Sequence, residues 1–417
     1  MNQPDTPENP AHDVAQAPLI GLAALMRMAH SGTDLTPVGA QLIERIERNP
    51  LDANALMDLS TILQFKGNRD VALSTQFQAL QIQQLYHAPS ASDAVAIRLL
   101  ALMGPGDLMA NTPLEFLLED SDVALDMLYV GPGVPVPTSL PEHDVLFVAI
   151  GESEQNLPLL AEMYKVVKDW ERPVLNSPDR IAWLSRDGAC ARLKFAPGLV
   201  MPITARVERE DLERIGRGEL ALSAVLEDGA FPVIVRPVDS HAGRGLEKLE
   251  DAAAIATYLQ ANPESMFYVS RFIDYRGADG QFRKYRIVLI AGRPFVSHMA
   301  ISDHWMIHYL NAGMAESAEK RAEEARFMET FDEDFAHRHA EAFRAINAAI
   351  GLDYLGIDCG ETADGALLIF EVDSNMVVHA TDPVDVYPYK QPQMRKVFAA
   401  FRAMLKNAMQ ATPGKDV

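Results

Sequence analysis

The sequence contains little cysteine and lacks a long hydrophobic run. Its two cysteines, Cys190 and Cys359, stand far apart among 417 residues, which excludes a disulfide framework and a cysteine-based zinc site and favours a reducing compartment. The most apolar early stretch, LIGLAALM, is broken by Arg27 and His30 and is far shorter than the roughly 20 residues that span a bilayer. We therefore expect a cytoplasmic protein without a transmembrane helix.

Basic residues are also scarce. The chain has 37 Lys and Arg against 58 Asp and Glu, a net charge of −21, and an acidic field of that size disfavours binding to nucleic acid or to an anionic membrane. The first eighteen residues contain no Lys, no Arg and no apolar core, so they do not form a signal peptide, and residues 1–17 are predicted to be a disordered tail. The length predicts a globular protein of roughly two to four domains.

Residues 18–129 carry apolar side chains at spacings of three and four, a pattern typical of amphipathic helices. We expect an all-α domain here. Within it, residues 49–84 read as two helices joined at Gly67-Asn68, with Ala72 and Ala79 in the second helix, and they resemble one tetratricopeptide repeat. One repeat cannot bury its own face, so either neighbouring helices complete a small solenoid or the pair packs on the rest of the chain. These helices could also bind a protein partner.

A proline- and glycine-rich stretch at 130–143 predicts a linker between domains. The segment after it, 144–185, has a continuous apolar run, a helical spacing and a second short apolar run, which predicts a β-α-β unit with a parallel sheet. Short strands and helices alternate over the remainder, 186–417. The fold class is therefore an α/β or α+β catalytic part preceded by an all-α, helical-repeat-like domain.

The strongest candidate site is an acidic hairpin, YLGIDCGETADGALLIFEVDSN. Its two apolar runs flank Asp364-Gly365, a favoured two-residue turn, and with that loop Asp358 falls opposite Glu371. Asp373 projects from the same face because side chains alternate along a strand. Like charges about 5 Å apart across strands require a compensating cation, and oxygen ligands suit Mg²⁺ or Mn²⁺. A different turn would misalign the acids, and a solvated acidic strand face is the alternative.

A second candidate site is FPVIVRPVDSHAGRGLEKL, in which a strand runs into a loop with two glycines. Gly243 and Gly245 let backbone N–H groups approach an anion, and positive groups lie beside them, on Arg236, His241 and Arg244. The segment is predicted to hold phosphates. A glycine-rich turn that stands alone more often only reverses the chain.

A third candidate site is a basic hairpin that turns at Ala291-Gly292. Lys284 and Arg286 alternate onto one face of its first strand, where they suit contacts with phosphate or carboxylate. The alternative is that these basic residues lie on an edge strand, exposed to solvent, where their charge prevents pairing with a strand of another molecule. Downstream, His304 and His308 could share one helix face, but no HExxH arrangement accompanies them, which argues against a zinc site. We expect their segment to be a loop on the substrate side of the site.

In order, the chain offers a β-α-β unit, a strand ending in a basic residue before a glycine-rich loop, an apolar strand, a basic hairpin and an acidic hairpin. This order resembles the ATP-grasp superfamily, particularly its glutathione-synthetase and ribosomal-peptide-modifying ligase branches, over about 144–410. The resemblance implies ATP with Mg²⁺ or Mn²⁺ between two subdomains, here about 186–265 and 266–417. It also implies that a carboxylate of a small metabolite or peptide is activated as an acyl phosphate for an amine or thiol.

The resemblance leaves two other functions open, and it implies a dimer only by analogy. One alternative is an ATP-dependent phosphotransferase, and the other is a non-catalytic helical-repeat protein with a nucleotide-binding domain. Many ATP-grasp proteins form homodimers, but nothing in this sequence specifies an interface.

Carried over by motif, the resemblance also gives roles to individual residues. Arg286 would lie near the transferring phosphoryl group, with Asn311 as a second, approximately placed catalytic residue. Asp373 stands where the family usually has Asn, so either Asp373 or Asn375 is the third metal ligand, and Lys284 stands where relatives have an acid. The metal ligands would be Asp358, Glu371, Asp373 and Asn375. The nucleotide-binding residues would be Arg186, Arg236, Ser240, His241, Gly243, Arg244, Gly245, Val269, Ser270, Arg271, Phe272, Ile273 and Lys284.

Overall fold

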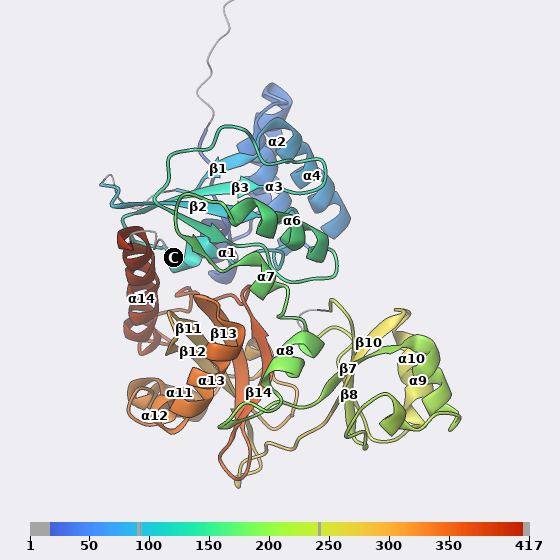
Figure 1. Ribbon diagram of the computed structural model, residues 1–417. Coiled ribbons are helices and arrows are strands. Elements are labelled where there is room, and N and C mark those ends of the chain that lie inside the picture. The colour runs from blue at the N-terminus through green and yellow to red at the C-terminus, as the bar shows by residue number, and fades with distance from the viewer. Residues whose placement is uncertain (1–16, 90–91, 93, 241–242, 412–417) are drawn as a thin grey trace, which may run out of the picture.

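The computed structural model describes residues 17–89, 92, 94–240 and 243–411, so most of the predicted tail lies outside it. Within these residues the strands form three sheets, in the orders β1-β3-β2-β4-β5, β7-β10-β8-β9 and β12-β11-β13-β14-β6. The first sheet and its helices lie above the other two sheets, and the long helix α14 (Lys390–Gln410) runs down one side (Figure 1). The described helices include none with the length and apolar character needed to cross a membrane.

The first sheet is mostly parallel and is covered on both faces. Its strands β2 and β4 are almost entirely buried, which explains their continuous apolar sequences. Leu100 and Leu102 face helix α6, whereas Leu99 and Ala101 face helices α3 and α14. The strands are β1 (Leu85–His87), β2 (Ile97–Met103), β3 (Val123–Tyr129), β4 (Val145–Val148) and β5 (Val174–Leu175), and the nearby helices are α5 (Leu114–Leu117), α6 (Leu157–Val167) and α7 (Pro178–Ile181).

The prediction of an all-α domain over 18–129 is wrong beyond the fourth helix. The helices are α1 (Leu22–His30), α2 (Thr36–Arg48), α3 (Ala53–Phe65) and α4 (Arg69–Ile82), and β1 to β3 follow them. Because β2 pairs with β4, the stretch 130–143 connects strands of one sheet and is not a domain boundary. A seven-residue apolar run such as IRLLALM fits a buried strand and a buried helix equally well by periodicity.

The helix pair α3–α4 is confirmed, with Gly67 in the left-handed conformation at the turn between them. Its inner residues Ala53, Leu56, Ala79 and Leu80 belong to the same core as the first sheet and helix α14. Of the two arrangements that the sequence left open, the structure therefore shows the pair packed on the rest of the chain.

Helix α1 is held at its N-terminus by two carboxylates. Asp58 accepts hydrogen bonds from the backbone N–H groups of Ile20 (2.8 Å) and Gly21 (3.0 Å), and Glu115 accepts one from Ala23 (3.1 Å). The Gly21 and Ala23 N–H groups are among those that a helix start leaves without intrahelical partners. Burial raises the pKa of Asp58 to about 6 and that of Glu115 to about 7.

The raised pKa of Glu115 predicts that stability falls as the pH rises. Folded Glu115 keeps its proton up to about pH 7 whereas the unfolded side chain loses it near its ordinary value of 4.5, so its contribution is lost across that window. Glu115→Gln keeps an acceptor oxygen and removes the titration. Urea unfolding at pH 5 and pH 8 should show a wild-type loss about 2.5 kcal/mol larger than that of the variant. Equal losses would contradict this, and exposed Glu47→Gln is the matched control.

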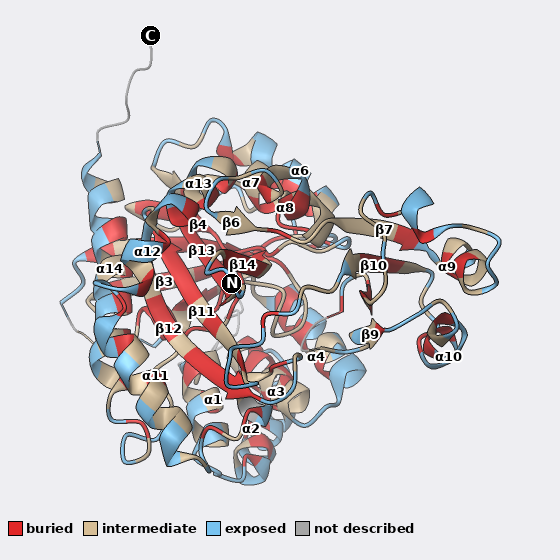
Figure 2. Cartoon of the chain, turned by 90° about the horizontal axis from the view of Figure 1, so that it is seen from below, coloured by how far each residue is buried: buried red, intermediate tan, exposed pale blue. Residues whose placement is uncertain are grey.

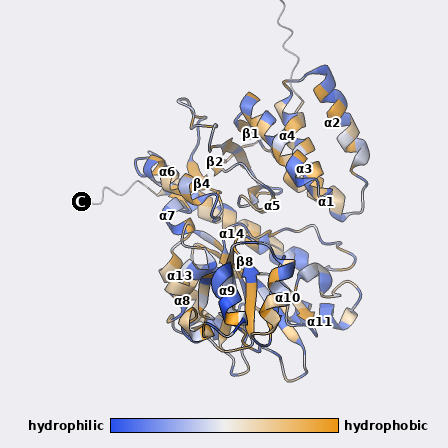
Figure 3. Cartoon of the chain, turned by 90° about the vertical axis from the view of Figure 1, so that its right-hand side faces the viewer, coloured by the Kyte–Doolittle hydropathy of each residue, from blue (hydrophilic) through white to orange (hydrophobic). Residues whose placement is uncertain are grey.

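The second and third sheets form the lower half of the molecule. Helices α9 and α10 cover the second sheet, whose strand β8 shows its apolar character in Figure 3, and the strands of the third sheet are largely buried (Figure 2). The second sheet has β7 (Thr204–Glu208), β8 (Val233–Pro237), β9 (Glu247–Leu249) and β10 (Met266–Arg271), with α9 (Arg209–Gly216), η1 (Leu222–Ala224) and α10 (Ala254–Ala261). The third has β6 (Leu199–Val200), β11 (Phe282–Ile290), β12 (Arg293–Ser302), β13 (Tyr354–Glu361) and β14 (Leu367–Asp373), with α8 (Arg186–Leu193), η2 (Tyr309–Asn311), α11 (Ala318–Thr330), α12 (Phe335–Arg338) and α13 (Ala340–Ile350).

The predicted subdomain boundary at 265/266 is wrong by one strand. Strand β10 pairs with both β7 and β8, so it completes the second sheet, and the chain crosses to the third sheet only after residue 271. In the other direction, β6 pairs with β14 and belongs to the third sheet. Hydrophobic patterns locate strands along a chain, but they do not specify which sheet a strand joins.

Candidate functional site

A cavity of about 750 Å³ lies between the second and third sheets. One wall comes from β8 and β10, and the other from β11, β13 and β14. Helix α1 also reaches it, through Met26 and His30. Basic and acidic side chains are both present on the walls: Arg186, Arg236, Arg271, Lys284, Arg286 and Lys390 as cations, and Glu316, Asp358, Glu371, Asp373 and Asp382 as carboxylates.

A row of charged side chains, two carboxylates flanked by two arginines, lies at the floor of this cavity. Arg286 on β11 is the register partner of Asp358 on β13, and Asp358 is the partner of Glu371 on β14. The Arg286 guanidinium donates to both Asp358 oxygens, at 2.8 and 3.0 Å. At the other end of the row, Arg186 donates to Glu371 at 2.6 Å. The two carboxylates that face each other are thus neutralised by arginines from outside the hairpin.

The predicted pairing of Asp358 with Glu371 is confirmed, but the turn that predicted it is wrong. The hairpin closes with Thr362 bonded to Ala366, so the loop has three residues, with Gly365 at φ 82. This moves the register by one residue near the loop, and a bulge at Phe370 moves it back before Glu371. The two offsets cancel.

The three predicted acids differ in charge state because their partners differ. Burial alone would raise the pKa of Asp358, but Arg286 and Lys284 hold it well below its usual range. For Glu371, burial is likewise opposed, by Arg186 and Arg236, and the pKa is lowered. The pKa of Asp373 is raised to about 6 by burial and by the neighbouring Glu371 carboxylate. Only Asp373 lacks a cation partner among the described residues.

The predicted metal ligands do not form one cluster. In the part of the chain that the structure describes, no three His, Cys, Asp or Glu side chains are placed to hold a metal ion. Both oxygens of Asp358 are occupied by Arg286 and Lys284. Asn375 is buried, and its amide donates to the Met109 carbonyl (2.9 Å) while accepting from Ser374 (3.0 Å). Its side chain therefore connects the end of the acidic hairpin to the segment that follows β2.

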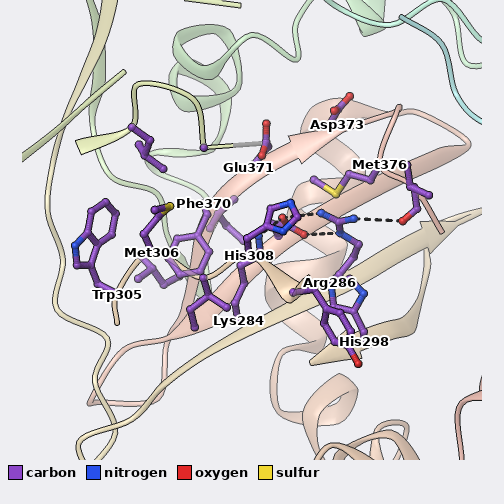
Figure 4. A pocket seen from close by; sticks show the side chains of 18 of the residues that line it. Lys284, Arg286, His298, Trp305, Met306, His308, Phe370, Glu371, Asp373 and Met376 are labelled. Carbon is purple, nitrogen blue, oxygen red and sulfur yellow. Dashed lines mark hydrogen bonds and ion pairs between the residues drawn. The ribbon is translucent and has the colours of Figure 1, made fainter. Parts of the chain in front are cut away.

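Glu371 and Asp373 remain available on the cavity side. Both line the cavity and point to the same side of their strand (Figure 4). Glu371 pairs with Arg186 through one oxygen, and Asp373 accepts the Asn375 backbone N–H through one oxygen, at 2.9 Å. Each has a second oxygen without a hydrogen bond within the described residues. Two carboxylates that share a face fit one Mg²⁺ that is also held by phosphates.

The glycine-rich loop keeps part of its predicted arrangement. Arg236 is buried at the end of β8 and donates to Ser240 Oγ at 3.0 Å and to the Ser240 carbonyl; burial lowers the pKa of Arg236 to about 10. Gly243 lines the cavity, and Gly245 has φ 64 with Pro237 closely packed against it. Arg244 points elsewhere, to Glu264 at 2.6 Å. His241 lies outside the described residues.

Four of the five predicted hinge residues reach the cavity. Ser270, Arg271, Phe272 and Ile273 line it, whereas Val269 is fully buried in the core of the second sheet. The correction follows from alternation along β10, which turns Val269 to the α9–α10 side. Apolar side chains that could enclose a planar base line the same cavity as this hinge: Met201, Ile234, Trp305, Leu368 and Phe370.

At the other end, the cavity holds polar side chains that motif reasoning did not assign. Lys390 is buried and contacts Asp382 at 3.0 Å and the Tyr309 hydroxyl. The His298 ring lies 4.6 Å from the Tyr309 ring, and burial lowers the pKa of His298 well below its usual value. Asn311, predicted to be catalytic, is exposed and is not among the lining residues. Lys390 is the first residue of the long helix α14, and no sequence motif identifies it as a site residue.

Helix α1 closes this end. His30 Nδ1 lies 2.8 Å from Thr381 Oγ1, which is itself 2.8 Å from His379 Nδ1, and the two histidine rings are 5.4 Å apart. These residues are about 350 positions apart in the chain, so only the tertiary fold reveals that the helical region contributes to the cavity.

No protein-family model matches this chain. Solved structures with some similarity include the D-alanine–D-alanine ligase from Bacillus anthracis complexed with ATP, at 11% identity and TM-score 0.46, covering 76% of this chain and 100% of that chain. The VanG D-Ala:D-Ser ligase from Enterococcus faecalis has 14% identity and TM-score 0.45, with 74% and 99% covered. A RimK domain ATP-grasp protein from Sphaerobacter thermophilus has 17% identity and TM-score 0.41, with 75% and 100% covered. Likeness at this level carries no argument about activity, so the chemistry is argued from this chain's own residues.

Proposed function

We propose that this chain is an ATP-dependent ligase that activates a carboxylate as an acyl phosphate for attack by an amine or thiol. The observation that carries the proposal is the arrangement of side chains in one cavity, where Trp305, Met306 and Phe370 lie on one side of Lys284 and Arg286, and His298 lies on the other (Figure 4). Trp305 packs against Phe272 of the 270–273 hinge, the cations Arg186, Arg236, Lys284 and Arg286 line the same cavity, and His298 contacts Tyr309, which is bonded to Lys390. A base, a polyphosphate and an acceptor fit this arrangement.

The nucleotide half of the proposal depends on the cations. Arg236 is buried and Arg186 is largely so, and both lie where phosphates that follow a base in the hinge slot would be. Arginine suits phosphate oxygens because its planar fork donates two parallel hydrogen bonds. Glu371 and Asp373 would hold one Mg²⁺, which when bound neutralises charge on the phosphate oxygens.

The acceptor half depends on Arg286. In the proposed reaction a carboxylate oxygen of the substrate attacks the terminal phosphorus, the bond to the bridging oxygen breaks, and ADP leaves. Arg286 stabilises the negative charge on the transferring group. The amine or thiol then attacks the acyl carbon and expels inorganic phosphate. A phosphotransferase shares the first displacement but has an acceptor that keeps the phosphate.

The packing of the N-terminal helices supports a catalytic role over a detached interaction module. Helices α3 and α4 share a core with the first sheet, and Met26 and His30 of α1 line the cavity itself. A module that only recruited a partner would have no reason to form part of the cavity wall.

Hydroxylamine trapping tests the proposed function. The protein is incubated with ATP, Mg²⁺, hydroxylamine and pools of small carboxylates or peptides, and ADP and hydroxamate are both measured. An acyl phosphate reacts with hydroxylamine, so a ligase should give hydroxamate and ADP in equal amounts with one pool. Equal amounts of ADP and a stable phosphorylated product, without hydroxamate, would show a phosphotransferase instead.

A further inference from the structure

The carboxylate of Asp358 is already neutralised by two cations of the chain itself. Lys284 Nζ lies 2.7 Å from Oδ2, and Arg286 donates to both oxygens. The Asp358 side chain is only 3% exposed, against 18% for Lys284 and 20% for Arg286. Two positive charges therefore meet one buried negative charge, and the surplus charge is positive.

This arrangement is fixed by the sheet. Arg286 is the direct register partner of Asp358, and Lys284 lies two residues earlier on β11, on the same face. Arg286 is held from a second side, because it also donates to the Val377 carbonyl at 3.2 Å. A divalent cation on Asp358 would have to displace Lys284 or sit beside two positive charges in a site with little water to screen them.

The Asp373 side of the same hairpin is different. Its register partner is Gly356, which carries no side chain, and Met376 packs over that glycine. No cation pairs with Asp373 in the described residues, and its one protein hydrogen bond comes from the Asn375 backbone N–H. The uncompensated negative charge of the hairpin is therefore on Asp373, and the neighbouring Glu371, which pairs with Arg186 through one oxygen, keeps its second oxygen without a hydrogen bond in the described residues.

We infer that the Lys284 ammonium takes the place of a divalent cation at Asp358, so that the nucleotide-bound site holds one divalent ion, on Glu371 and Asp373. The inference depends on the nucleotide site of the proposed function. Lys284 lines the cavity, and its remaining N–H groups would donate to the terminal phosphates. Asp358 then acts as a positioning residue for Lys284 and Arg286, and not as a metal ligand.

The test measures how many Mn²⁺ ions bind per bound nucleotide. Mn²⁺ is titrated into the full chain saturated with a non-hydrolysable ATP analogue, and free Mn²⁺ is followed by electron paramagnetic resonance. The wild type should bind one Mn²⁺ per nucleotide, and Asp358→Asn should also bind one, with an affinity within about threefold. Lys284→Glu should bind two, whereas Lys165→Glu, the same charge change at an exposed position, should still bind one.

Two Mn²⁺ per nucleotide in the wild type, or a tenfold or larger loss of Mn²⁺ affinity in Asp358→Asn, would overturn the inference. A second measurement applies if Lys284→Glu does not fold. In EDTA, Lys284→Met should weaken binding of the metal-free nucleotide about 10- to 100-fold, the size expected for a lost charge-assisted hydrogen bond, and unchanged binding would contradict the role of Lys284. Wild-type protein that binds no nucleotide at all would instead refute the proposed function, and this inference with it.

Discussion

Replacing Arg286 by methionine should lower the rate of acyl phosphate formation about 1,000-fold or more, while nucleotide binding changes much less. Arg286 lies on the cavity floor with its guanidinium fixed by Asp358 and by the Val377 carbonyl. Arginines that stabilise a transferring phosphoryl group contribute about 10³- to 10⁵-fold to turnover. The measurement is the initial rate of hydroxamate formation at saturating ATP.

Two further variants separate chemistry from folding in this prediction. Among the described residues, Arg286→Met leaves Asp358 with Lys284 as its one cation partner, so a loss of activity could reflect a disturbed sheet. The double variant Arg286→Met/Asp358→Asn removes both partners of the pair and should restore stability without restoring the rate. Exposed Arg326→Met is the control for a lost arginine. A rate for Arg286→Met within threefold of wild type would refute the assigned role.

Replacing Glu324 by alanine should lower the free energy of unfolding by about 3–5 kcal/mol, the usual cost of breaking a buried ion pair. Glu324 on α11 is fully buried and accepts hydrogen bonds from the Met299 backbone N–H (3.0 Å) and the Tyr389 hydroxyl (2.6 Å). It also lies 3.5 Å from the buried Lys390 ammonium. Removing the carboxylate leaves these groups without their acceptor at the polar end of the cavity.

Urea unfolding followed by circular dichroism measures this effect. Glu329→Ala changes an exposed glutamate on the same helix and should stay within about 0.5 kcal/mol of wild type. The double variant Glu324→Leu/Lys390→Met removes both charges and should recover much of the loss, because apolar replacements of a buried pair are often close to neutral. A single variant within 1 kcal/mol of wild type would show that this network does not anchor α11 to α14.

The sequence predicted best where one local pattern decides the structure. The helix pair at Gly67 and the hairpin at Ala291-Gly292 are both predicted correctly, since each depends on a short turn with a glycine at positive φ. Strands β2 and β3 were missed because a buried parallel strand has no alternation to distinguish it from a buried helix. The assignment of β10 to the wrong sheet has a similar origin, because pairing is decided by tertiary contacts.

In the candidate site, too, the features that depend on a local pattern were predicted and those that depend on tertiary contacts were not. Asp358, Glu371 and Asp373 were recognised as acids on one hairpin, and they do line the cavity. Their partners could not be predicted, because Lys284 and Arg186 reach them from a neighbouring strand and a distant helix. Asn311 and Val269 were misplaced for a simpler reason: a motif locates a residue along the chain, but one step of strand alternation or one loop residue decides whether its side chain faces the cavity.

The measurement that tests the central claim most directly is calorimetric titration of the full chain with a non-hydrolysable ATP analogue, with and without Mg²⁺. The account predicts one nucleotide per chain, tighter binding with Mg²⁺, and a loss of about 100-fold or more in the double variant Arg186→Gln/Arg236→Gln, since each arginine supplies charge-assisted hydrogen bonds to phosphate. Absence of binding by the folded wild type, or equal affinity in the double variant, would show that this cavity is not a nucleotide site.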